Sequence, residues 1–264
     1  MMAEHSATSA LKIQIQGVSK WFGSATQPMP ALLDIVLDVH SNEFLCLLGP
    51  SGCGKSTLLN IVAGFIPPSE GRVLADGAAI TAPGRDRGVV FQEYALFPWL
   101  TVQENVEFGP KLQGTRKTER RQMAGKYLDL VGLTAHRHKF PAQLSGGMKQ
   151  RVAIARALAN NPTVILMDEP FGSLDAQTRE VMQEELARIQ RFEHKTVIFV
   201  THSIREAVYL ADRVAVMTSS PGKIKEVVAI DLPEPRDKFS AAFTRYESAI
   251  TRGLKEEVEK AREG

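Results

Sequence analysis

The chain has 264 residues, of which 44% are hydrophobic and 23% charged, so it has the composition of an ordinary globular protein and not of a disordered or membrane-embedded one. Its 32 lysine and arginine residues against 30 acidic residues give a net charge of +2, which gives no support to a nucleic-acid partner. Two cysteines, a polar N-terminus and no apolar stretch near the roughly 20 residues of a membrane span favour a cytosolic protein without a secretory signal.

The first part of the chain has the pattern of strands followed by a helix. Residues 11–18 and 31–39 alternate apolar and polar side chains, which predicts half-buried strands of an antiparallel sheet. The apolar run at 44–48 predicts a central strand that is covered on both faces. After a glycine-rich turn, residues 56–65 predict a helix that stops at two prolines, and residues 71–80 predict a hairpin.

The pattern changes after a short predicted strand at 89–91. From residue 93 to residue 160, helical spacing replaces strand-like alternation, which indicates a helical insertion. Its last helix should begin after Ser145 and end before Pro162. Apolar runs separated by helical segments then return, which is typical of a parallel α/β sheet. These runs are residues 164–168, 196–200 and 212–217.

These patterns predict an α/β fold in which a core brackets an inserted helical subdomain. Residues 1–92 form an N-terminal β subdomain and the first part of the core, 93–160 the helical subdomain, 161–230 the rest of the core, and 231–264 a tail. We expect the tail to be a helix packed on its own core, because its apolar residues have helical spacing. They are Phe243, Tyr246, Ile250, Leu254 and Val258.

A glycine-rich segment lies between the buried strand and the first helix and fits the pattern G-x-x-x-x-G-K-[ST]. Its glycines let backbone amides approach phosphate oxygens closely, and the following helix offers its positive N-terminal end. Lys55 should reach the β- and γ-phosphates of ATP, and Ser56 should reach Mg²⁺. An ordinary glycine-rich turn is the alternative. The predicted phosphate-binding residues are Gly49, Pro50, Ser51, Gly52, Cys53, Gly54, Lys55, Ser56 and Thr57.

Two adjacent acids follow the apolar run at 164–168. Asp168 and Glu169 lie at the carboxyl end of a predicted strand, where open α/β sheets bind ligands. Asp168 would hold Mg²⁺ through its water shell, and Glu169 could polarise a water that attacks the γ-phosphate. The alternative is a pair of solvated loop residues.

A second candidate anion site is formed by Ser145, Gly146 and Gly147 at the start of a predicted helix, in the segment LSGGMKQ at 144–150. With this segment the chain resembles the ATPases of ABC transporters, whose mark is an LSGGQ-like signature ahead of the Asp-Glu strand. Here Met148 replaces the glutamine, which affects a peripheral nucleotide contact. The resemblance implies a P-loop NTPase core with a RecA-like parallel sheet. It also implies a head-to-tail dimer, in which each ATP lies between the Lys55 loop of one chain and the Ser145 loop of the other.

The resemblance assigns roles to further residues. Gln92 looks like the glutamine that contacts Mg²⁺ and the attacking water, and His202 like the histidine that contacts the γ-phosphate; a lone histidine is otherwise a bystander. The segment from Ser173 to Asp175 resembles a loop that crosses the dimer interface, although Asp175 could equally cap a helix. Phe22 aligns better than Trp21 with the aromatic residue that stacks on adenine, whereas simple packing is the alternative for both.

Two segments are similar to those of importers of nitrate, sulfonate, taurine and related solutes: EYALFPWLTVQENVEFGPKLQG at 93–114 and MDEPFGSLDAQTREVMQEEL at 167–186. The resemblance therefore implies an integral-membrane permease, indirectly a solute-binding protein, and a peripheral position on the cytoplasmic face of the inner membrane. An exporter or lipid-trafficking ATPase and a soluble non-transport ABC ATPase are the alternatives. Part of an aromatic patch after Gln92 is expected to form the groove for the permease. The patch consists of Tyr94, Phe97, Pro98, Trp99 and Leu100.

The two cysteines are expected to differ in reactivity. Cys53 lies in the phosphate loop, close to Lys55 and to a helix N-terminus, and both would stabilise its thiolate. Cys53 should therefore alkylate readily, with Mg·ATP shielding it, whereas Cys46 in the buried strand should be inert.

Overall fold

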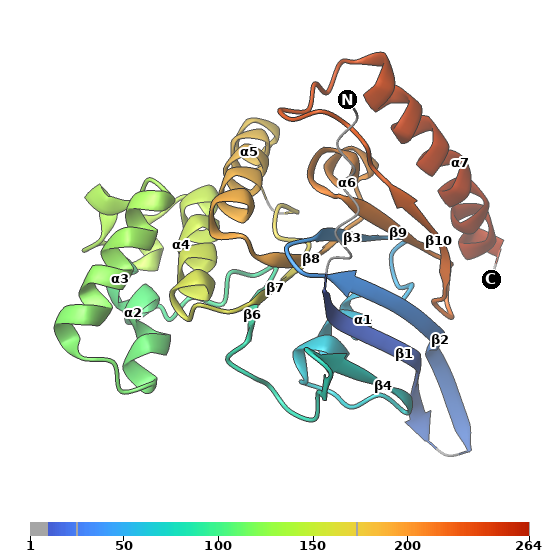
Figure 1. Ribbon diagram of the computed structural model, residues 1–264, viewed down its shortest axis with the longest axis horizontal. Helices are drawn as coiled ribbons and strands as arrows, with labels where there is room; N and C mark the ends of the chain where they lie inside the picture. Colours follow the sequence, from blue (N-terminus) through green and yellow to red (C-terminus); the bar gives the residue numbers. More distant parts are fainter. Residues whose placement is uncertain (1–9, 25, 173, 264) are drawn as a thin grey trace.

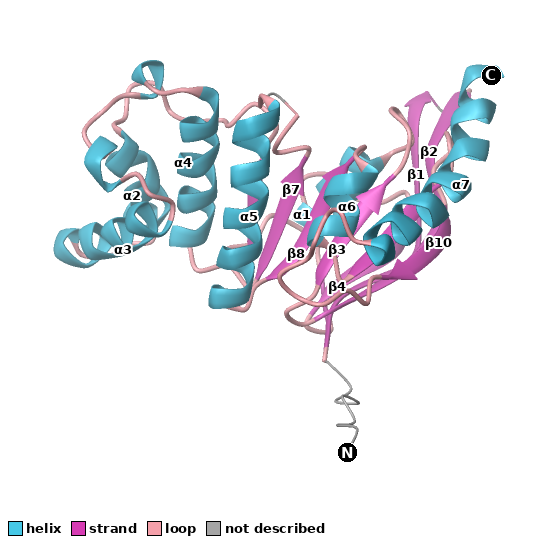
Figure 2. Cartoon of the chain, turned by 90° about the horizontal axis from the view of Figure 1, so that it is seen from above, coloured by secondary structure: helices cyan, strands magenta, loops and turns pink. Residues whose placement is uncertain are grey.

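The structure is a computed structural model that describes residues 10–24, 26–172 and 174–263, without the side chains of residues 256 and 258–263. Two sheets form the centre of the molecule, and a group of helices extends from one side of it (Figures 1 and 2). Ser173, one of the residues with a predicted interface role, lies outside the described residues.

The smaller sheet is antiparallel and has the strand order β2-β1-β4-β5. Its strands are β1 (Leu11–Ser24), β2 (Gln27–His40), β4 (Glu70–Ala75) and β5 (Ala78–Ala79). The first two strands are longer than the predicted 11–18 and 31–39, because they continue as a hairpin beyond the core, where Phe22 pairs with Met29. Both of these residues are exposed, so the buried-exposed alternation that carried the prediction is absent there.

The larger sheet has the order β10-β9-β3-β8-β7-β6, and its five strands other than β10 run parallel. The parallel order brings the carboxyl ends of β3, β7 and β8 to one edge, where α/β sheets bind ligands. This arrangement confirms the predicted fold class. The strands are β3 (Phe44–Leu48), β6 (Arg87–Val90), β7 (Val164–Asp168), β8 (Thr196–Thr201), β9 (Arg213–Met217) and β10 (Ile224–Ala229).

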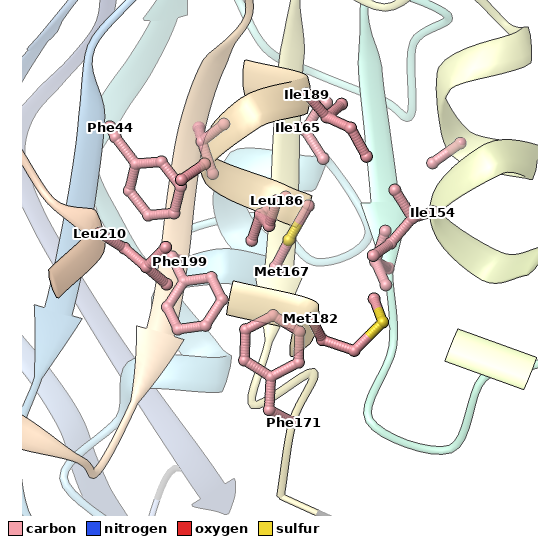
Figure 3. Close-up of a cluster of buried hydrophobic side chains, with 14 of the residues drawn as sticks. Phe44, Ile154, Ile165, Met167, Phe171, Met182, Leu186, Ile189, Phe199 and Leu210 are labelled. Carbon is pink, nitrogen blue, oxygen red and sulfur yellow. The ribbon is translucent and has the colours of Figure 1, made fainter. Parts of the chain in front are cut away.

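Different helices cover the two faces of the larger sheet. On one face, helix α1 (Lys55–Ala63) shares a core cluster with the smaller sheet and with Leu45 and Leu47 of β3. The other face carries Cys46 and Leu48 of β3 and a second cluster (Figure 3). The helices that contribute to this second cluster include α4 (Gly146–Ala159), α5 (Ala176–Glu193), α6 (Ile204–Leu210) and α7 (Ala241–Glu263). Because successive side chains of β3 point to opposite faces of the sheet, the clusters that contain α1 and α4 lie on opposite faces.

The segment between β6 and β7 contains the helices α2 (Val102–Leu112), α3 (Lys117–Leu130) and α4, with short 3₁₀ turns at Thr134–His136 and Pro141–Gln143. Helix α2 begins with a capping box, in which the Thr101 hydroxyl accepts from the Glu104 amide and the Glu104 carboxylate accepts from the Thr101 amide. Helix α4 begins directly after Ser145 and ends before Pro162, within the limits predicted from the sequence.

The last part of the chain forms helix α7, which lies along the core (Figure 1). Its Phe243 and Ile250 are fully buried, and Tyr246 and Leu254 pack against the same cluster. The side chain of Val258 lies outside the described residues. Among the helices that the structure describes, none combines the length and the apolar character needed to cross a bilayer.

Candidate active site

The loop from residue 49 to residue 54 connects β3 to α1 and requires glycine at two positions for lack of space. A Cβ on Gly54 would lie 2.6 Å from the Cδ2 atom of Leu32, and a Cβ on Gly49 would lie 2.7 Å from the Sγ atom of Cys53. Gly52 and Gly54 also have φ angles of 79° and 96°, a conformation that glycine adopts without strain. The sequence pattern therefore reflects both the backbone conformation and the close packing of this loop.

The N-terminus of α1 has backbone amides that no side chain caps and that can bind an anion. Its N-cap is Gly54, which supplies no side chain to the first amides; α3 also lacks a side-chain cap, whereas α2, α4, α5 and α6 are each capped by a side chain. The amides of the first turn of α1 are therefore left for an external acceptor. The Lys55 ammonium lies inside the loop, where it donates to the carbonyl oxygens of Gly49 and Pro50 at 2.8 Å each. Amides and ammonium together fit a phosphate chain.

The ends of α1 and β7 meet at a pair of oxygen-bearing side chains. The Ser56 hydroxyl donates to the Oδ1 atom of Asp168 at 3.0 Å. Burial raises the pKa of Asp168, and the charge of Glu169 adds to this rise, while the Ser56 hydrogen bond and the charge of Lys55 oppose it. Mg²⁺ is usually held by one or two protein oxygens together with substrate phosphates and waters, so this pair fits the ion.

The raised pKa of Asp168 predicts a cost to stability. The free energy of unfolding should fall as pH rises from the ordinary aspartate pKa to the raised one and stay lower above it. We therefore expect Asp168→Asn, which keeps an acceptor for Ser56, to raise the Tm of the nucleotide-free protein at pH 7. The gain should disappear in acid, where Asp168 is protonated in both states.

Calorimetry at pH 7 and at an acidic pH measures the Tm of the variant and of the wild type. The exposed Asp38→Asn is the control, and it should leave the Tm unchanged. A lower Tm for Asp168→Asn at pH 7 would show that the carboxylate stabilises the fold.

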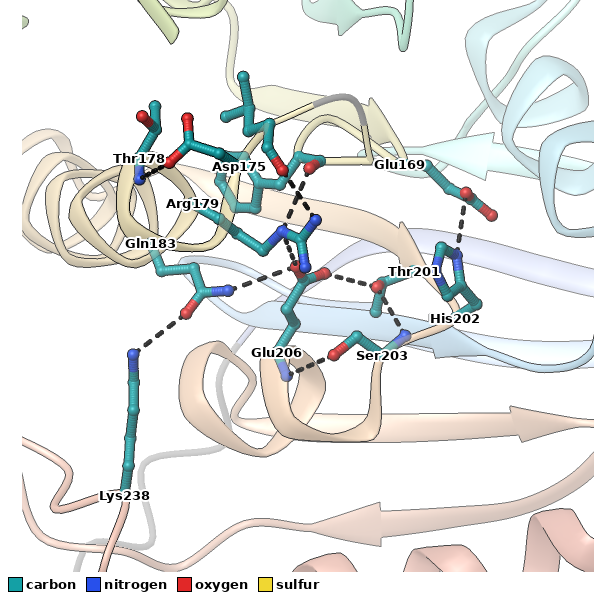
Figure 4. A network of polar contacts seen from close by, with 12 residues as sticks. Glu169, Asp175, Thr178, Arg179, Gln183, Thr201, His202, Ser203, Glu206 and Lys238 are labelled. Atoms are coloured by element: carbon teal, nitrogen blue, oxygen red, sulfur yellow. Dashed lines mark hydrogen bonds and ion pairs between the residues drawn. The ribbon is translucent and has the colours of Figure 1, made fainter.

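Glu169 and His202 face each other across the carboxyl ends of β7 and β8. The Nδ1 atom of His202 lies 3.0 Å from the Oε2 atom of Glu169 (Figure 4). Glu169 has a φ of 42°, a strained conformation for a residue with a side chain, and backbone bonds to Val200 and Gly172 hold it there. The site thus presents a carboxylate with an oriented imidazole beside it, an arrangement that can polarise a water molecule.

Gln92 is close to this pair. It lies two residues beyond the end of β6, which stops at Val90, and is exposed. A Cβ on Gly172 would lie 3.5 Å from the Nε2 atom of Gln92 and 4.0 Å from the Oε2 atom of Glu169. The structure therefore brings Gln92 and Glu169 close together around Gly172, and their roles toward Mg²⁺ and the attacking water stay predictions.

Ser145 is exposed at the N-terminus of α4, where its hydroxyl accepts from the Met148 amide at 3.3 Å. The two glycines after it have a packing role that sequence reasoning did not anticipate. A Cβ on Gly147 would lie 2.4 Å from the Cγ2 atom of Thr178 in α5, and a Cβ on Gly146 would lie 3.1 Å from the Tyr94 hydroxyl. Gly147 therefore lets the start of α4 approach α5 closely, and Gly146 lets it approach Tyr94.

Asp175 and the aromatic candidates lie at the margins of the site. The Asp175 carboxylate caps α5 by accepting from the Thr178 amide at 3.0 Å, and this bond lowers its pKa. Trp21 pairs with Pro30 and Phe22 with Met29 in the hairpin, next to Ala31, which contacts the phosphate loop at Gly54. The interface role of Asp175 and the stacking of Phe22 on adenine remain predictions.

The expectation that Cys53 alkylates readily is wrong. Its side chain is fully buried in the cluster beneath the loop, and burial raises its pKa despite the opposing charge of Lys55. The thiol turns toward Gly49 and the core cluster, away from solvent. Cys46 is also fully buried, with a pKa raised well above its ordinary value, which agrees with its predicted inertness.

Sequence reasoning missed two charged residues behind the site, Arg179 and Glu206. They belong to a polar network that also contains Gln183 and Thr201 (Figure 4). The sequence signal was weak, because Glu206 follows Arg205 and only the residues after it are mostly apolar. Only the fold shows that this acid is buried.

Comparison with known proteins identifies the family. A model of the ABC transporter family matches residues 32–172, a span that contains the phosphate loop, the Ser145 segment and Glu169. The chain belongs to the ABC transporter family and is an ATPase, which confirms the resemblance and the activity predicted from the motifs.

Similar proteins come from archaea and bacteria. An uncharacterized ABC transporter ATP-binding protein of Methanocaldococcus jannaschii is 54% identical over 95% of this chain and 94% of its own. The nitrate import ATP-binding protein of Synechococcus elongatus is 50% identical over 90% of this chain and 88% of its own. The aliphatic sulfonates import ATP-binding protein of Bacillus cereus is 44% identical, with coverages of 91% and 94%.

A solved structure has a similar fold. It is the dimeric structure of an ATP-binding cassette in a post-hydrolysis state, bound to ADP and Pi. It is 35% identical to this chain, covers 83% of it and 99% of its own chain, and has a TM-score of 0.72.

Proposed function

We propose that two copies of this chain bind two Mg·ATP head to tail and that hydrolysis powers the import of a small solute through a separate integral-membrane permease. Each nucleotide lies between the Lys55 loop of one copy and the Ser145 loop of the other. Relatives named for nitrate and sulfonate import support a solute of this kind, such as nitrate, a sulfonate or taurine, delivered by a solute-binding protein. The ATPase subunits then lie on the cytoplasmic face of the inner membrane.

The positions of α1 and α4 in the chain support the head-to-tail dimer. The two candidate phosphate-binding helix N-termini of a chain belong to helices on opposite faces of the larger sheet. Helix α1 packs in the cluster with Leu45 and Leu47, and α4 in the cluster with Cys46 and Leu48. Helices on opposite faces of a sheet are separated by more than a helix diameter of about 10 Å. A second chain supplies the Ser145 loop that one chain cannot bring to its own Lys55.

The residues at the carboxyl ends of the parallel strands have separate roles in ATP hydrolysis. Lys55 and the first amides of α1 hold the β- and γ-phosphates, and Ser56 with Asp168 holds Mg²⁺ together with Gln92. A bound Mg²⁺ would supply positive charge against the charge that develops on the phosphates. Glu169 accepts a proton from the attacking water, and His202 orients Glu169 through their 3.0 Å contact and faces the γ-phosphate.

A groove supports the permease as the membrane partner. A cavity of about 450 Å³ lies between the core and the α2–α4 segment and is lined by aromatic residues and by Arg156. Arg156 donates to the carbonyl oxygens of Tyr94 and Ala95 and so fixes the segment after Gln92. The aromatic lining suits an apolar helix of the permease. Its aromatic residues are Phe65, Phe91, Phe97 and Phe108.

The alternatives are less well supported. An exporter or lipid-trafficking ATPase and a non-transport ATPase would use the same catalytic residues, but the relatives named for nitrate and for aliphatic sulfonates are import proteins. Co-purification with an integral-membrane protein encoded nearby tests the transport half of the proposal.

Ser145→Arg should separate nucleotide binding from dimerisation. In a Glu169→Gln background, where bound ATP persists, we expect Mg·ATP to convert the protein to dimers. Adding Ser145→Arg should keep it monomeric while ATP still binds the Lys55 loop, because arginine fills the second anion site of the partner. Light scattering during size exclusion measures the mass, and a fluorescent nucleotide measures binding.

Thr101→Arg is the matched control. It removes the side-chain cap of α2, as Ser145→Arg removes that of α4, and introduces the same bulk elsewhere in the helical segment. The control should still dimerise with ATP. Equal dimerisation of the Ser145→Arg protein would exclude the Ser145 loop from the shared site.

A further inference from the structure

A buried carboxylate lies behind the Glu169 and His202 pair. Glu206 of α6 is 7% exposed, and both of its oxygens are engaged. Its Oε2 atom accepts from the Thr201 hydroxyl at 2.6 Å, and its Oε1 atom accepts from the Gln183 amide at 3.3 Å. The Nε atom of Arg179 lies 3.7 Å from the same Oε1 atom. Such a satisfied buried network fixes the relative positions of the segments that contribute to it.

Arg179 connects Glu206 to the loop that follows Glu169. Its Nη2 atom donates to the carbonyl oxygen of Leu174 at 2.9 Å, and its Nε atom donates to that of Phe171 at 3.3 Å. The planar guanidinium thus holds two carbonyls of one loop in a fixed orientation. Since this loop begins at Glu169, its position affects where the Glu169 carboxylate lies.

Thr201 connects Glu206 to His202. Thr201 is the last residue of β8 and directly precedes the histidine. Its hydroxyl donates to Glu206 and accepts from the Ser203 amide at 3.0 Å, so the backbone is held on both sides of His202. Figure 4 shows both connections meeting at the one carboxylate.

We propose that Glu206 is a positioning residue for ATP hydrolysis, which holds the Glu169 loop through Arg179 and the His202 backbone through Thr201. This inference rests on the proposed roles of Glu169 and His202. Glu206 does not itself contact the nucleotide. Its effect is to keep the two reacting side chains at the spacing seen here, where their atoms are 3.0 Å apart.

Glu206→Gln is expected to lower kcat by about tenfold to about 100-fold, the scale of small misplacements at a reacting centre, with little change in KM for ATP. Glutamine has nearly the shape of glutamate but loses the negative charge beside Arg179. The glutamine amide also has a single acceptor oxygen, whereas the Glu206 carboxylate accepts hydrogen bonds with both of its oxygens. Nucleotide affinity should persist because the phosphate loop lies on other elements.

Glu43→Gln is a matched control. Glu43 is also 7% exposed and also pairs with an arginine, since its Oε1 atom lies 2.9 Å from the Nη1 atom of Arg213. It lies at the amino end of β3, at the opposite edge of the sheet from the site. We expect a lower Tm in both variants but a lower kcat per folded protein only in Glu206→Gln. Equal kcat values for the two variants and the wild type would overturn the inference.

A second variant covers the case in which Glu206→Gln folds poorly. Arg179→Lys keeps the positive charge but cannot hold two carbonyls in one plane. It should lower kcat without raising KM, and combining it with Glu206→Gln should cost no more than the larger single effect if both act as one unit. Additive losses, or a loss confined to KM, would contradict the inference.

Glu169→Gln in the same assay separates this inference from the proposed function. If that variant keeps full activity, the proposed role of Glu169 fails. If it loses activity while Glu206→Gln and Arg179→Lys do not, only the positioning role fails.

Discussion

Glu169→Gln is expected to reduce kcat for ATP hydrolysis by about 100-fold or more, the usual scale for loss of a general base. The amide keeps the size of the side chain and can still contact His202, but it cannot accept a proton from water. Binding should be preserved because Lys55 and the α1 amides hold the phosphates. Single-turnover hydrolysis measures the chemical step, and a fluorescent nucleotide measures binding.

The purified dimer should persist with bound ATP in this variant. Glu104→Gln, which alters an exposed carboxylate in the α2 cap, is a control that should keep normal turnover. Unchanged hydrolysis by Glu169→Gln would remove Glu169 from the role of base.

Lys55→Ala should instead act on nucleotide binding. Lys55 is 5% exposed and its ammonium donates within the phosphate loop, so its removal leaves no cation among the loop amides. Charge-assisted hydrogen bonds contribute roughly 1.5–3 kcal/mol, and we therefore expect affinity for Mg·ATP to fall by about tenfold to about 100-fold.

Titration calorimetry of the Lys55→Ala protein measures this loss. Lys12→Ala removes a lysine that pairs with Asp76 away from the site, and it should bind Mg·ATP as the wild type does. Wild-type affinity in the Lys55→Ala protein would be incompatible with the assigned phosphate loop.

Local sequence patterns were sufficient for much of the fold and site. The buried strand β3, the glycine spacing of the phosphate loop and the cap at Ser145 were each recognisable from residues close in sequence, although Gly54 is also required by its contact with the distant Leu32. The parallel strands β7 and β8 were recognisable because a strand buried on both faces must be continuously apolar. Placing Asp168, Glu169 and His202 at one edge then followed from the parallel direction of these strands.

Other features depend on contacts between residues far apart in the sequence. Strand β10 is mostly exposed at the edge of the sheet, so its residues 224–229 show no buried pattern. Cys53 looked reactive because its sequence neighbours suggested a thiolate, but the fold turns it into the core and desolvation dominates. Glu206 and Arg179 are 27 positions apart by their numbering, and only folding brings them to 3.7 Å.

The central claim is that each ATP site is built from two chains, and a tandem-linked dimer tests it through the placement of two lesions. In one arrangement, Lys55→Ala is in the first half and Ser145→Arg in the second. In the other arrangement, both substitutions are in the same half and the remaining half is wild type. Both linked proteins carry the same two changes, so they differ only in which loops can meet.

ATPase activity of the two linked dimers is the decisive measurement. If sites are shared, separated lesions leave one interface with an intact Lys55 loop and an intact Ser145 loop, whereas lesions in one half damage both interfaces. The account therefore predicts activity only when the lesions are separated. Activity only when both lesions are in the same half would show that each chain hydrolyses ATP within itself and would contradict the shared site.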